Sequence, residues 1–271
     1  MKWTSLALLL FVAFPAFSQK IQQLDVQGYY PKLSPDGKQV LLTSSKFTGL
    51  KLYDLAGKST RSLTDKPGAG YGAEFNGDKI VFADKGTRQL MEVTTFSGKL
   101  SPLSAAKGEQ PHHFLALKNK AIQNLNKAVD ARPTSMLDGV IVTMANGEEK
   151  TFSPLGTRED YIWTSVSPDG QHILMKASGY TAVITDLNGN VVKDLGDLEA
   201  PKWLGNNRII YMETEDNHDT YIKSDIYVLS LDNQKSQKLT EGFGKIAMYP
   251  DAQEGKVVFN TPEGEVFMIE Y

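Results

Sequence analysis

One four-residue turn, Ser-Pro-Asp-Gly, occurs twice in this chain and limits what the chain can fold into. The copies are residues 34–37 and 167–170, and each stands between two short runs in which apolar and polar residues alternate. Proline presets φ for the second position of a type I turn, and glycine closes the turn without steric cost. Each copy therefore predicts a β-hairpin. The two serines are 167 − 34 = 133 positions apart, and a third of that separation, about 44 residues, matches the repeat length of a four-stranded propeller blade.

The rest of the chain repeats this hairpin pattern. Short runs rich in Val, Ile, Tyr, Phe and Thr alternate with turns of Gly, Asn and Asp, and almost no helical periodicity is present. This pattern is typical of all-β proteins. Six such units follow one another, with bounds near 29–64, 70–104, 111–154, 161–196, 200–240 and 245–271.

The last unit lacks an outermost strand, and the N-terminal part of the chain offers a replacement. Residues 19–26, QKIQQLDV, resemble the QKLTEG stretch that ends the fifth unit. A strand from the N-terminus closes a circular array and removes its open edges. The 271 − 18 = 253 residues after position 18 give about 42 per unit, as expected for four-stranded blades. We therefore predict an all-β fold, a six-bladed β-propeller of four-stranded antiparallel blades whose last blade is completed by the N-terminal strand.

Residues 1–18 have the pattern of a secretory signal peptide. The apolar run SLALLLFVAFPAF follows Lys2, and the small residues Ala16 and Ser18 occupy the −3 and −1 positions of a cleavage site. An N-terminal membrane anchor is the alternative, but a run of about a dozen residues is short for a bilayer span. We expect cleavage between Ser18 and Gln19, a periplasmic or extracellular location, and no transmembrane segment in the mature chain.

Charge and cysteine content narrow the class of protein further. Without Lys2 the chain carries 28 basic and 32 acidic residues, a net charge of −4, which gives no support for binding nucleic acid. The chain contains no cysteine, so a secreted protein of this sequence depends on its apolar core rather than on disulfides. We expect a monomer.

Three stretches, 30–64, 161–195 and 201–240, share the order of an S-P-D-G-like turn, a D-L strand end and a closing L-T or similar pair, and a proline precedes the turn in the first and third. This order resembles the propeller repeats of the TolB family, which also form the propellers of prolyl-oligopeptidase-type peptidases. The resemblance implies a propeller fold and, from TolB proteins, docking of an envelope lipoprotein at the propeller mouth. We expect neither the α/β domain that TolB proteins place before the propeller nor a peptidase domain. The G-x-S-x-G motif of a hydrolase nucleophile is absent from the sequence.

Histidines are the first candidates for a functional site. His112 and His113 open the expected innermost strand of the third unit, where side chains approach the central channel. Neighbouring residues of a strand point to opposite faces, so the pair is poorly suited to chelate one ion. His218 lies among acidic residues in EDNHDT, which lacks the ligand spacing and central glycine of a calcium loop. We therefore predict no metal site, no cofactor and no catalytic residue.

Aromatic residues are the second group of candidates. Tyr30 and Trp163 precede a column of residues expected to pack between blades, and they could reach the channel mouth, although packing aromatics are the simpler interpretation. The column consists of Leu33, Phe75, Val166, Trp203 and Tyr249. Tyr221 lies in the second of two segments that depart from the repeat, Ala128–Leu137 and Glu213–Ser224. Such insertions often mark the binding face of a repeat protein, but they are also compatible with tolerated loop variation.

These observations favour a secreted or periplasmic propeller that is not an enzyme and binds a protein or peptide partner in the cell envelope. The predicted ligand-binding or partner-binding residues are Tyr30, His112, His113, Trp163, His218 and Tyr221. A carbohydrate-binding or uronate-oligosaccharide lyase-like propeller with an axial pocket around His113 is the alternative, and a scaffold without a small-molecule site is a third interpretation.

Overall fold

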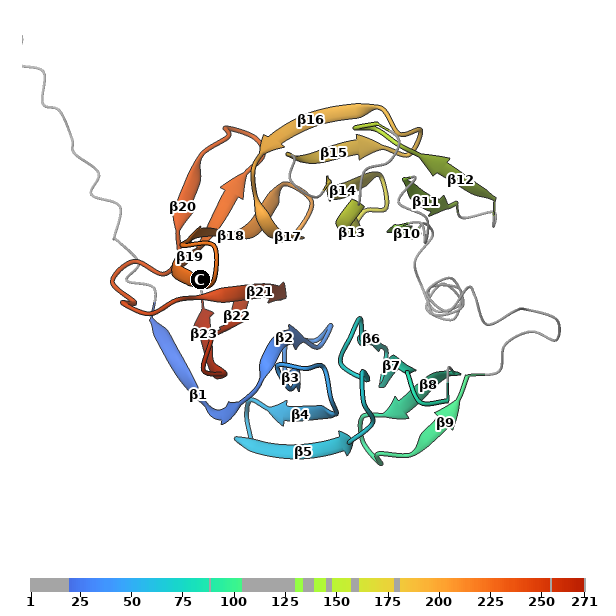
Figure 1. Ribbon diagram of the computed structural model, residues 1–271, viewed down its shortest axis with the longest axis vertical. Coiled ribbons are helices and arrows are strands. Elements are labelled where there is room, and N and C mark those ends of the chain that lie inside the picture. Colours follow the sequence, from blue (N-terminus) through green and yellow to red (C-terminus); the bar gives the residue numbers. More distant parts are fainter. Residues whose placement is uncertain are drawn as a thin grey trace, which may run out of the picture.

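The computed structural model describes residues 20–87, 89–103, 130–133, 139–144, 148–156, 161–177, 181–253 and 255–270. These residues form antiparallel sheets arranged radially around a central axis, which is the architecture of a β-propeller (Figure 1). In chain order the strands are β1 (Ile21–Gln27), β2 (Tyr29–Leu33), β3 (Gln39–Thr43), β4 (Leu50–Asp54), β5 (Ser59–Thr64), β6 (Glu74–Asn76), β7 (Lys79–Asp84), β8 (Gln89–Thr94), β9 (Leu100–Pro102), β10 (Asp130–Pro133), β11 (Val140–Thr143), β12 (Glu149–Phe152), β13 (Tyr161–Val166), β14 (His172–Ala177), β15 (Ala182–Asp186), β16 (Val191–Gly196), β17 (Glu199–Trp203), β18 (Arg208–Asp216), β19 (Tyr221–Ser230), β20 (Ser236–Lys238), β21 (Met248–Gln253), β22 (Lys256–Asn260) and β23 (Glu265–Glu270).

The described residues form five four-stranded blades, not the six that the sequence predicted. Their strand orders, from the axis outward, are β2-β3-β4-β5, β6-β7-β8-β9, β13-β14-β15-β16, β17-β18-β19-β20 and β21-β22-β23-β1. A separate sheet of three strands, β10-β11-β12, lies beside the β13 blade (Figure 1). The stretch near residue 111 that was expected to supply an innermost strand for this unit lies outside the described residues, as does the predicted leader 1–18.

The N-terminal strand completes the last blade, as the sequence predicted. Strand β1 pairs antiparallel with β23, with Ile21 opposite Ile269, and the register shifts between Gln23 and Gln27. At this shift Leu24 turns into the interface between the last blade and the first blade, where it packs with Tyr53 of β4 and other buried residues. The same strand thus covers the edge of β23 and joins the two ends of the ring.

The core lies between neighbouring blades because both faces of each sheet are covered. Ile80 and Phe82 of β7 are fully buried and belong to one apolar cluster with Leu41 and Leu52 of the first blade. A comparable cluster joins the β17 blade and the last blade, with Ile226 and Phe259 among its members. Burying a side chain of this size contributes about 1.5–3 kcal/mol, so the blades stabilise one another without disulfides.

Both Ser-Pro-Asp-Gly copies form the tight turns that link β2 to β3 and β13 to β14. In the first turn Gly37 has a left-handed φ of 64° and its N–H donates to the carbonyl of Ser34 at 2.8 Å. The buried Ser34 hydroxyl donates to Asp36 at 2.7 Å and accepts from the Gln39 N–H at 2.9 Å. The Ser34 hydroxyl, in turn, lowers the pKa of Asp36. The motif is therefore a structural unit of the hairpin.

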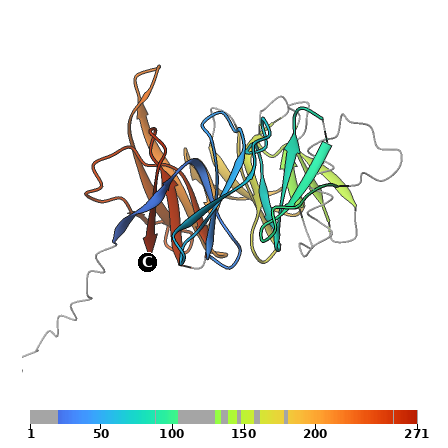
Figure 2. The same ribbon diagram turned by 90° about the horizontal axis from the view of Figure 1, so that it is seen from below.

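These turns define two faces of the ring. We call the side that carries residues 34–37 and 167–170 the SPDG face. Because innermost strands end at this side, second strands begin there and end on the opposite face, which carries the β3–β4 loop, the β5–β6 loop and the tip of the β18–β19 hairpin. This hairpin is the longest in the molecule among the described strands and rises above the ring (Figure 2).

The described parts of the two segments that depart from the repeat form strands, which the sequence did not indicate. Residues 213–224 continue β18 and β19 as a paired hairpin, with Glu213 opposite Asp225 and Asp216 opposite Tyr221. Within the other segment, Asp130–Pro133 forms β10. Residues 213–220 are all polar, and this composition resembles a loop although a solvated antiparallel hairpin tolerates it. Among the described residues, no helix has the length and apolarity needed to cross a membrane.

Candidate functional site

One residue of left-handed backbone recurs at the same place in five blades, near the face opposite the SPDG turns. In four blades it lies within the innermost strand, and in the second blade it lies just before β6. The residues are Tyr30, Gly72, Trp163, Ala200 and Tyr249, with φ values of 53°, 65°, 55°, 48° and 53°. At four of them the register with the second strand shifts, which identifies a β-bulge. Glycine adopts this conformation freely, whereas other residues incur a cost of about 1–2 kcal/mol. The bulge belongs to the repeat, but the aromatic residues at three of its positions do not.

Four aromatic rings from three blades form a continuous row on this face. Tyr249 and Tyr30 have ring centroids 4.6 Å apart, Tyr30 stacks on Phe47 at 4.4 Å, and Phe47 meets Tyr71 edge-on at 5.4 Å. Lys85 extends the row, with its amine 5.5 Å from the centre of the Tyr71 ring. Phe47 is also left-handed, with a φ of 58°. We call Tyr249, Tyr30, Phe47 and Tyr71 the aromatic row.

Backbone contacts between blades hold the row in place. The N–H of Tyr30 donates to the side-chain oxygen of Asn260, a buried residue of the last blade, at 3.0 Å. The N–H of Gly70, next to Tyr71, donates to the carbonyl of Phe47 at 3.0 Å. The bulged backbone is therefore tied across blade boundaries, which makes the row a preorganised surface.

An ion pair anchors the loop that carries Tyr71. Asp84 is buried, and its carboxylate accepts from Lys66 of the β5–β6 loop at 2.5 Å and from the Thr87 hydroxyl at 2.8 Å. Lys66, followed by the Thr87 hydroxyl, lowers the pKa of Asp84 to about 2. The carboxylate is therefore ionised under physiological conditions.

Tyrosine hydroxyls converge at one end of the row. Burial, followed by the proximity of Tyr30 and Tyr221, raises the pKa of Tyr249 well above its usual value. Burial and the nearby carboxylates of Glu199 and Asp216 raise the pKa of Tyr221. Tyr249 and Tyr221 therefore stay neutral at physiological pH and can donate hydrogen bonds at the channel mouth.

A buried lysine holds Glu199 beside these tyrosines. Lys176 of β14 is 2% exposed and pairs with Asp197 at 2.7 Å and with Glu199. Burial alone would lower the pKa of Lys176, but the two carboxylates outweigh burial and its pKa is raised. This charge therefore orders the start of β17 next to the hairpin.

The hairpin carries an acidic pocket of about 430 Å³. Its lining carboxylates are those of Asp197, Glu199, Glu213, Glu215, Asp216 and Asp225. Lysines neutralise part of this charge, since Lys223 pairs with Glu215 at 2.7 Å and Lys238 with Asp225 at 2.8 Å. Within the described ranges, no group of three His, Cys, Asp or Glu side chains is placed to hold a metal ion.

Charged side chains nearer the axis link one blade to the next. Asp251 of β21 accepts from the backbone N–H of Leu33 at 2.8 Å, and Lys32 donates to the carbonyl of Ala73 at 2.7 Å. Burial raises the pKa of Asp251, and Lys202 and Lys32 oppose that effect. These contacts satisfy backbone groups at the inner edges, so we assign them a structural role.

The predicted site residues separate into three groups. Tyr30 lies in the aromatic row, and Tyr221 lies close enough to Tyr249 to affect its pKa. Trp163 has the left-handed backbone but packs against the apolar cluster between the β17 blade and the last blade, and His218 lies exposed at the hairpin tip with a φ of 77°. His112 and His113 lie outside the described residues.

Sequence reasoning missed Phe47, Tyr71 and Tyr249. Tyr249 was placed with Leu33 in the packing column, but Ala252 occupies that position, because Ala252 pairs with Val257 as Leu33 pairs with Val40. A signal was available. Tyr-Pro occurs at residues 30–31 and again at 249–250, and Ala-Pro at 200–201, so the proline marks the left-handed position.

Comparisons with known proteins agree with this architecture. No family model and no curated protein matches the chain. Among solved structures, TolB from Acinetobacter baumannii is 16% identical with a TM-score of 0.53, over 92% of this chain and 56% of that protein. A putative TolB from Agrobacterium tumefaciens is 14% identical with a TM-score of 0.53, over 93% of this chain and 96% of its own. Virginiamycin B lyase from Staphylococcus aureus is 10% identical with a TM-score of 0.58, over 93% and 99%.

The likeness is one of fold. TolB-type propellers are among the structural neighbours, as the sequence motifs predicted, and this chain spans a little over half the length of the Acinetobacter protein. A lyase and TolB proteins match with similar scores, so function has to be argued from the residues of this chain.

Proposed function

We propose that this protein is a secreted or periplasmic, non-enzymatic β-propeller that binds a protein or peptide partner of the cell envelope through the aromatic row. The observation that carries the proposal is the row itself, in which Tyr249, Tyr30 and Phe47 occupy left-handed backbone. Strain of about 1–3 kcal/mol per residue persists where the structure over-determines it, and it clusters at functional sites. At the equivalent position, just before β6, the second blade has Gly72.

The surroundings of the row suit a macromolecular partner. Tyr71 is 54% exposed at one end of the row. The hairpin tip, on the same face, exposes Tyr221 and Ile222 by 38% and 57%. Aromatic residues are enriched in protein interfaces, and exposed apolar patches mark interaction sites. A partner segment lying across the first and last blades would contact both features.

The proposed location in the cell envelope rests on the leader sequence, residues 1–18, with its short apolar run and small residues before Gln19.

A glycan is the alternative ligand, because aromatic rings can stack on the faces of sugar rings and neutral phenol groups can donate hydrogen bonds to sugar hydroxyls. The lyase-like version of this alternative depends on His112 and His113, which lie outside the described residues.

Site-specific photo-crosslinking in living cells tests the proposal. A benzophenone amino acid is placed at Tyr71 of the aromatic row, and the control carries it at Phe96, which is 89% exposed in the β8–β9 turn on the SPDG face. We expect a discrete protein adduct from position 71 and none from position 96, and loss of the adduct in a Tyr30→Ala/Tyr249→Ala background. Equal adducts from both positions, or no adduct together with glycan binding to the purified protein, would refute partner binding at the row.

A further inference from the structure

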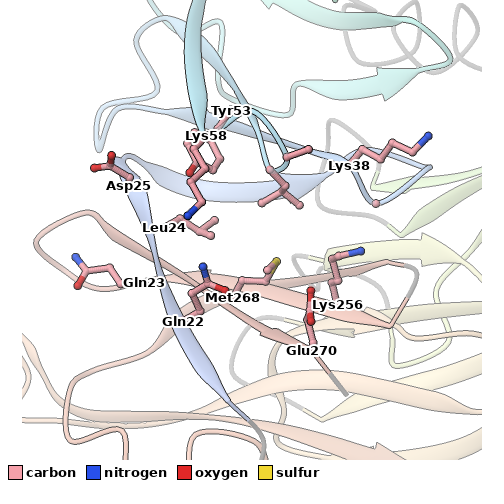
Figure 3. A pocket seen from close by; sticks show the side chains of 13 residues that line it. Gln22, Gln23, Leu24, Asp25, Lys38, Tyr53, Lys58, Lys256, Met268 and Glu270 are labelled. Carbon is pink, nitrogen blue, oxygen red and sulfur yellow. The ribbon is translucent and has the colours of Figure 1, made fainter.

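A second cavity lies on the SPDG face, the face opposite the aromatic row. It has a volume of about 390 Å³ and forms where β1 closes the ring between the last blade and the first blade (Figure 3). Its floor is apolar and consists of Leu24, Tyr53, Leu55 and Met268. Leu24, Tyr53 and Met268 are 5%, 1% and 7% exposed. A cavity of this size with such a floor falls in the usual range of small-molecule sites.

Two hydrogen-bond donors face each other across this floor. In Figure 3 the amine of Lys58 and the amide of Gln22 point toward the middle of the cavity, whereas Lys38 and Lys256 direct their amines away from it. The Lys38 amine lies 3.6 Å from the carboxylate of Asp36. Within the described part of the chain, Lys58 has no ion pair. The charge that points inward is therefore available to a ligand.

Local backbone geometry accounts for both donors. The register shift of β1 between Gln23 and Gln27 turns this part of the strand over the blade boundary, and bulges commonly re-aim side chains in this way. Lys58 has a left-handed φ of 47°, and the corresponding turn of the second blade has Gly98 at this position, with a φ of 68°. A lysine occupies a position that glycine would fill with less strain.

We propose that this cavity binds an amphipathic monoanion, with a carboxylate or similar head group and a short aliphatic tail. The head group accepts hydrogen bonds from Lys58 and Gln22, and the tail lies on Leu24, Tyr53 and Met268. Two carboxylates, Asp25 and Glu270, also line the cavity. Their repulsion disfavours a head group of higher charge, because like charges at the same site destabilise each other.

Octanoate is the probe for this site, and methyl-labelled methionine provides the readout. We expect the Met268 methyl resonance to shift on titration, while Met91, Met175 and Met212 stay unchanged as internal controls of location and folding. Octanol, which has the tail without the charge, should bind at least tenfold more weakly. A shift spread over all four methionines, or none at Met268, would overturn the proposal.

Charge-removal variants separate a binding lysine from general attraction. Lys58→Gln should weaken octanoate binding about tenfold, as expected for loss of a charge-assisted hydrogen bond, and should leave octanol binding unchanged. Lys99→Gln, beside the corresponding turn of the second blade, is the matched control and should have no effect. Gln22→Leu tests the second donor independently, should Lys58→Gln disturb folding. Equal affinities of the wild type, Lys58→Gln and Gln22→Leu would contradict the assignment, whatever the result of crosslinking at Tyr71.

Discussion

At the scale of single residues, left-handed backbone distinguishes structural positions from functional ones. Gly37 and Gly98 occupy such positions in turns where no side chain is needed. Tyr30, Tyr249 and Lys58 occupy similar backbone with large side chains. Left-handed backbone costs each of these residues about 1–2 kcal/mol. The packing between blades offsets this cost, and a role of the side chains in binding explains why glycine does not stand at these positions.

This contrast predicts opposite effects of exchanging glycine at two equivalent turn positions. Lys58→Gly should raise the free energy of unfolding by about 1 kcal/mol, and Gly98→Ala should lower it by about 1–2 kcal/mol. A methyl group on Gly98 would meet no atom within 4 Å, so the backbone alone accounts for the change. Urea unfolding measures both, and a loss of stability in Lys58→Gly would argue against strain at that position.

Acid sensitivity is a second prediction at this scale. Asp84 has a pKa of about 2, lowered from 3.8 chiefly by Lys66. A carboxyl group whose pKa is lower in the folded state than in the unfolded state stabilises the fold at any pH above its unfolded-state pKa. This stabilisation is lost as the pH falls toward the folded-state pKa. Asp84→Asn should therefore cost roughly 2 kcal/mol at pH 7, and the difference from wild type should shrink between about pH 4 and pH 2.

Urea unfolding at pH 7 and pH 2.5 measures this effect, with Asp219→Asn at the exposed hairpin tip as the control substitution. A cost for Asp84→Asn that is equal at the two pH values would show that the Asp84–Lys66 pair does not stabilise the loop that carries Tyr71.

At the scale of elements, β1 and the β18–β19 hairpin have distinct roles. Strand β1 covers the edge of β23 and brings Leu24 into the interface of the first and last blades. The hairpin extends away from the ring (Figure 2) and brings Tyr221 near the aromatic row. One element therefore closes the propeller, and the other enlarges the face that we propose for binding.

The closing role of β1 predicts different costs for two neighbouring residues. Leu24→Ala should lower the free energy of unfolding by about 2–5 kcal/mol, because it leaves a cavity in a buried interface. Gln23→Ala, on the exposed side of the same strand, should change it by less than about 0.5 kcal/mol. Thermal unfolding compares the two variants, and equal small changes would mean that β1 is not needed to hold the ring closed.

At the scale of the whole molecule, the sequence predicted the ring better than it predicted the binding face. The spacing of the SPDG copies and the apolar alternation indicated blades, because turns and strand faces are local properties. The resemblance of residues 19–26 to an outer strand indicated how the ring closes. The predicted number of complete four-stranded blades was wrong, since the described residues of the third unit, where the repeat pattern weakens, form a sheet of three strands.

The aromatic row could not be predicted from local sequence patterns. Tyr249 and Phe47 lie about two hundred positions apart in the chain. Tyr249 contacts Tyr30 only because the ring closes, and both tyrosines lie at the bulge that recurs in four innermost strands. Local hydrophobic patterns do not report such proximity. The repeated Tyr-Pro pair was the visible trace of the bulge, and it identifies Tyr249 once units are aligned on it.

The central claim is that the aromatic row is the binding face of the propeller. The most direct test measures the affinity of the partner captured at position 71 for two single variants, Tyr71→Ala and Phe96→Ala. Both remove one exposed aromatic ring, but from opposite faces. We predict at least a tenfold loss of affinity for Tyr71→Ala, as expected for an interface residue worth more than about 1.4 kcal/mol, and no change for Phe96→Ala. Equal affinities of the two variants would contradict the account.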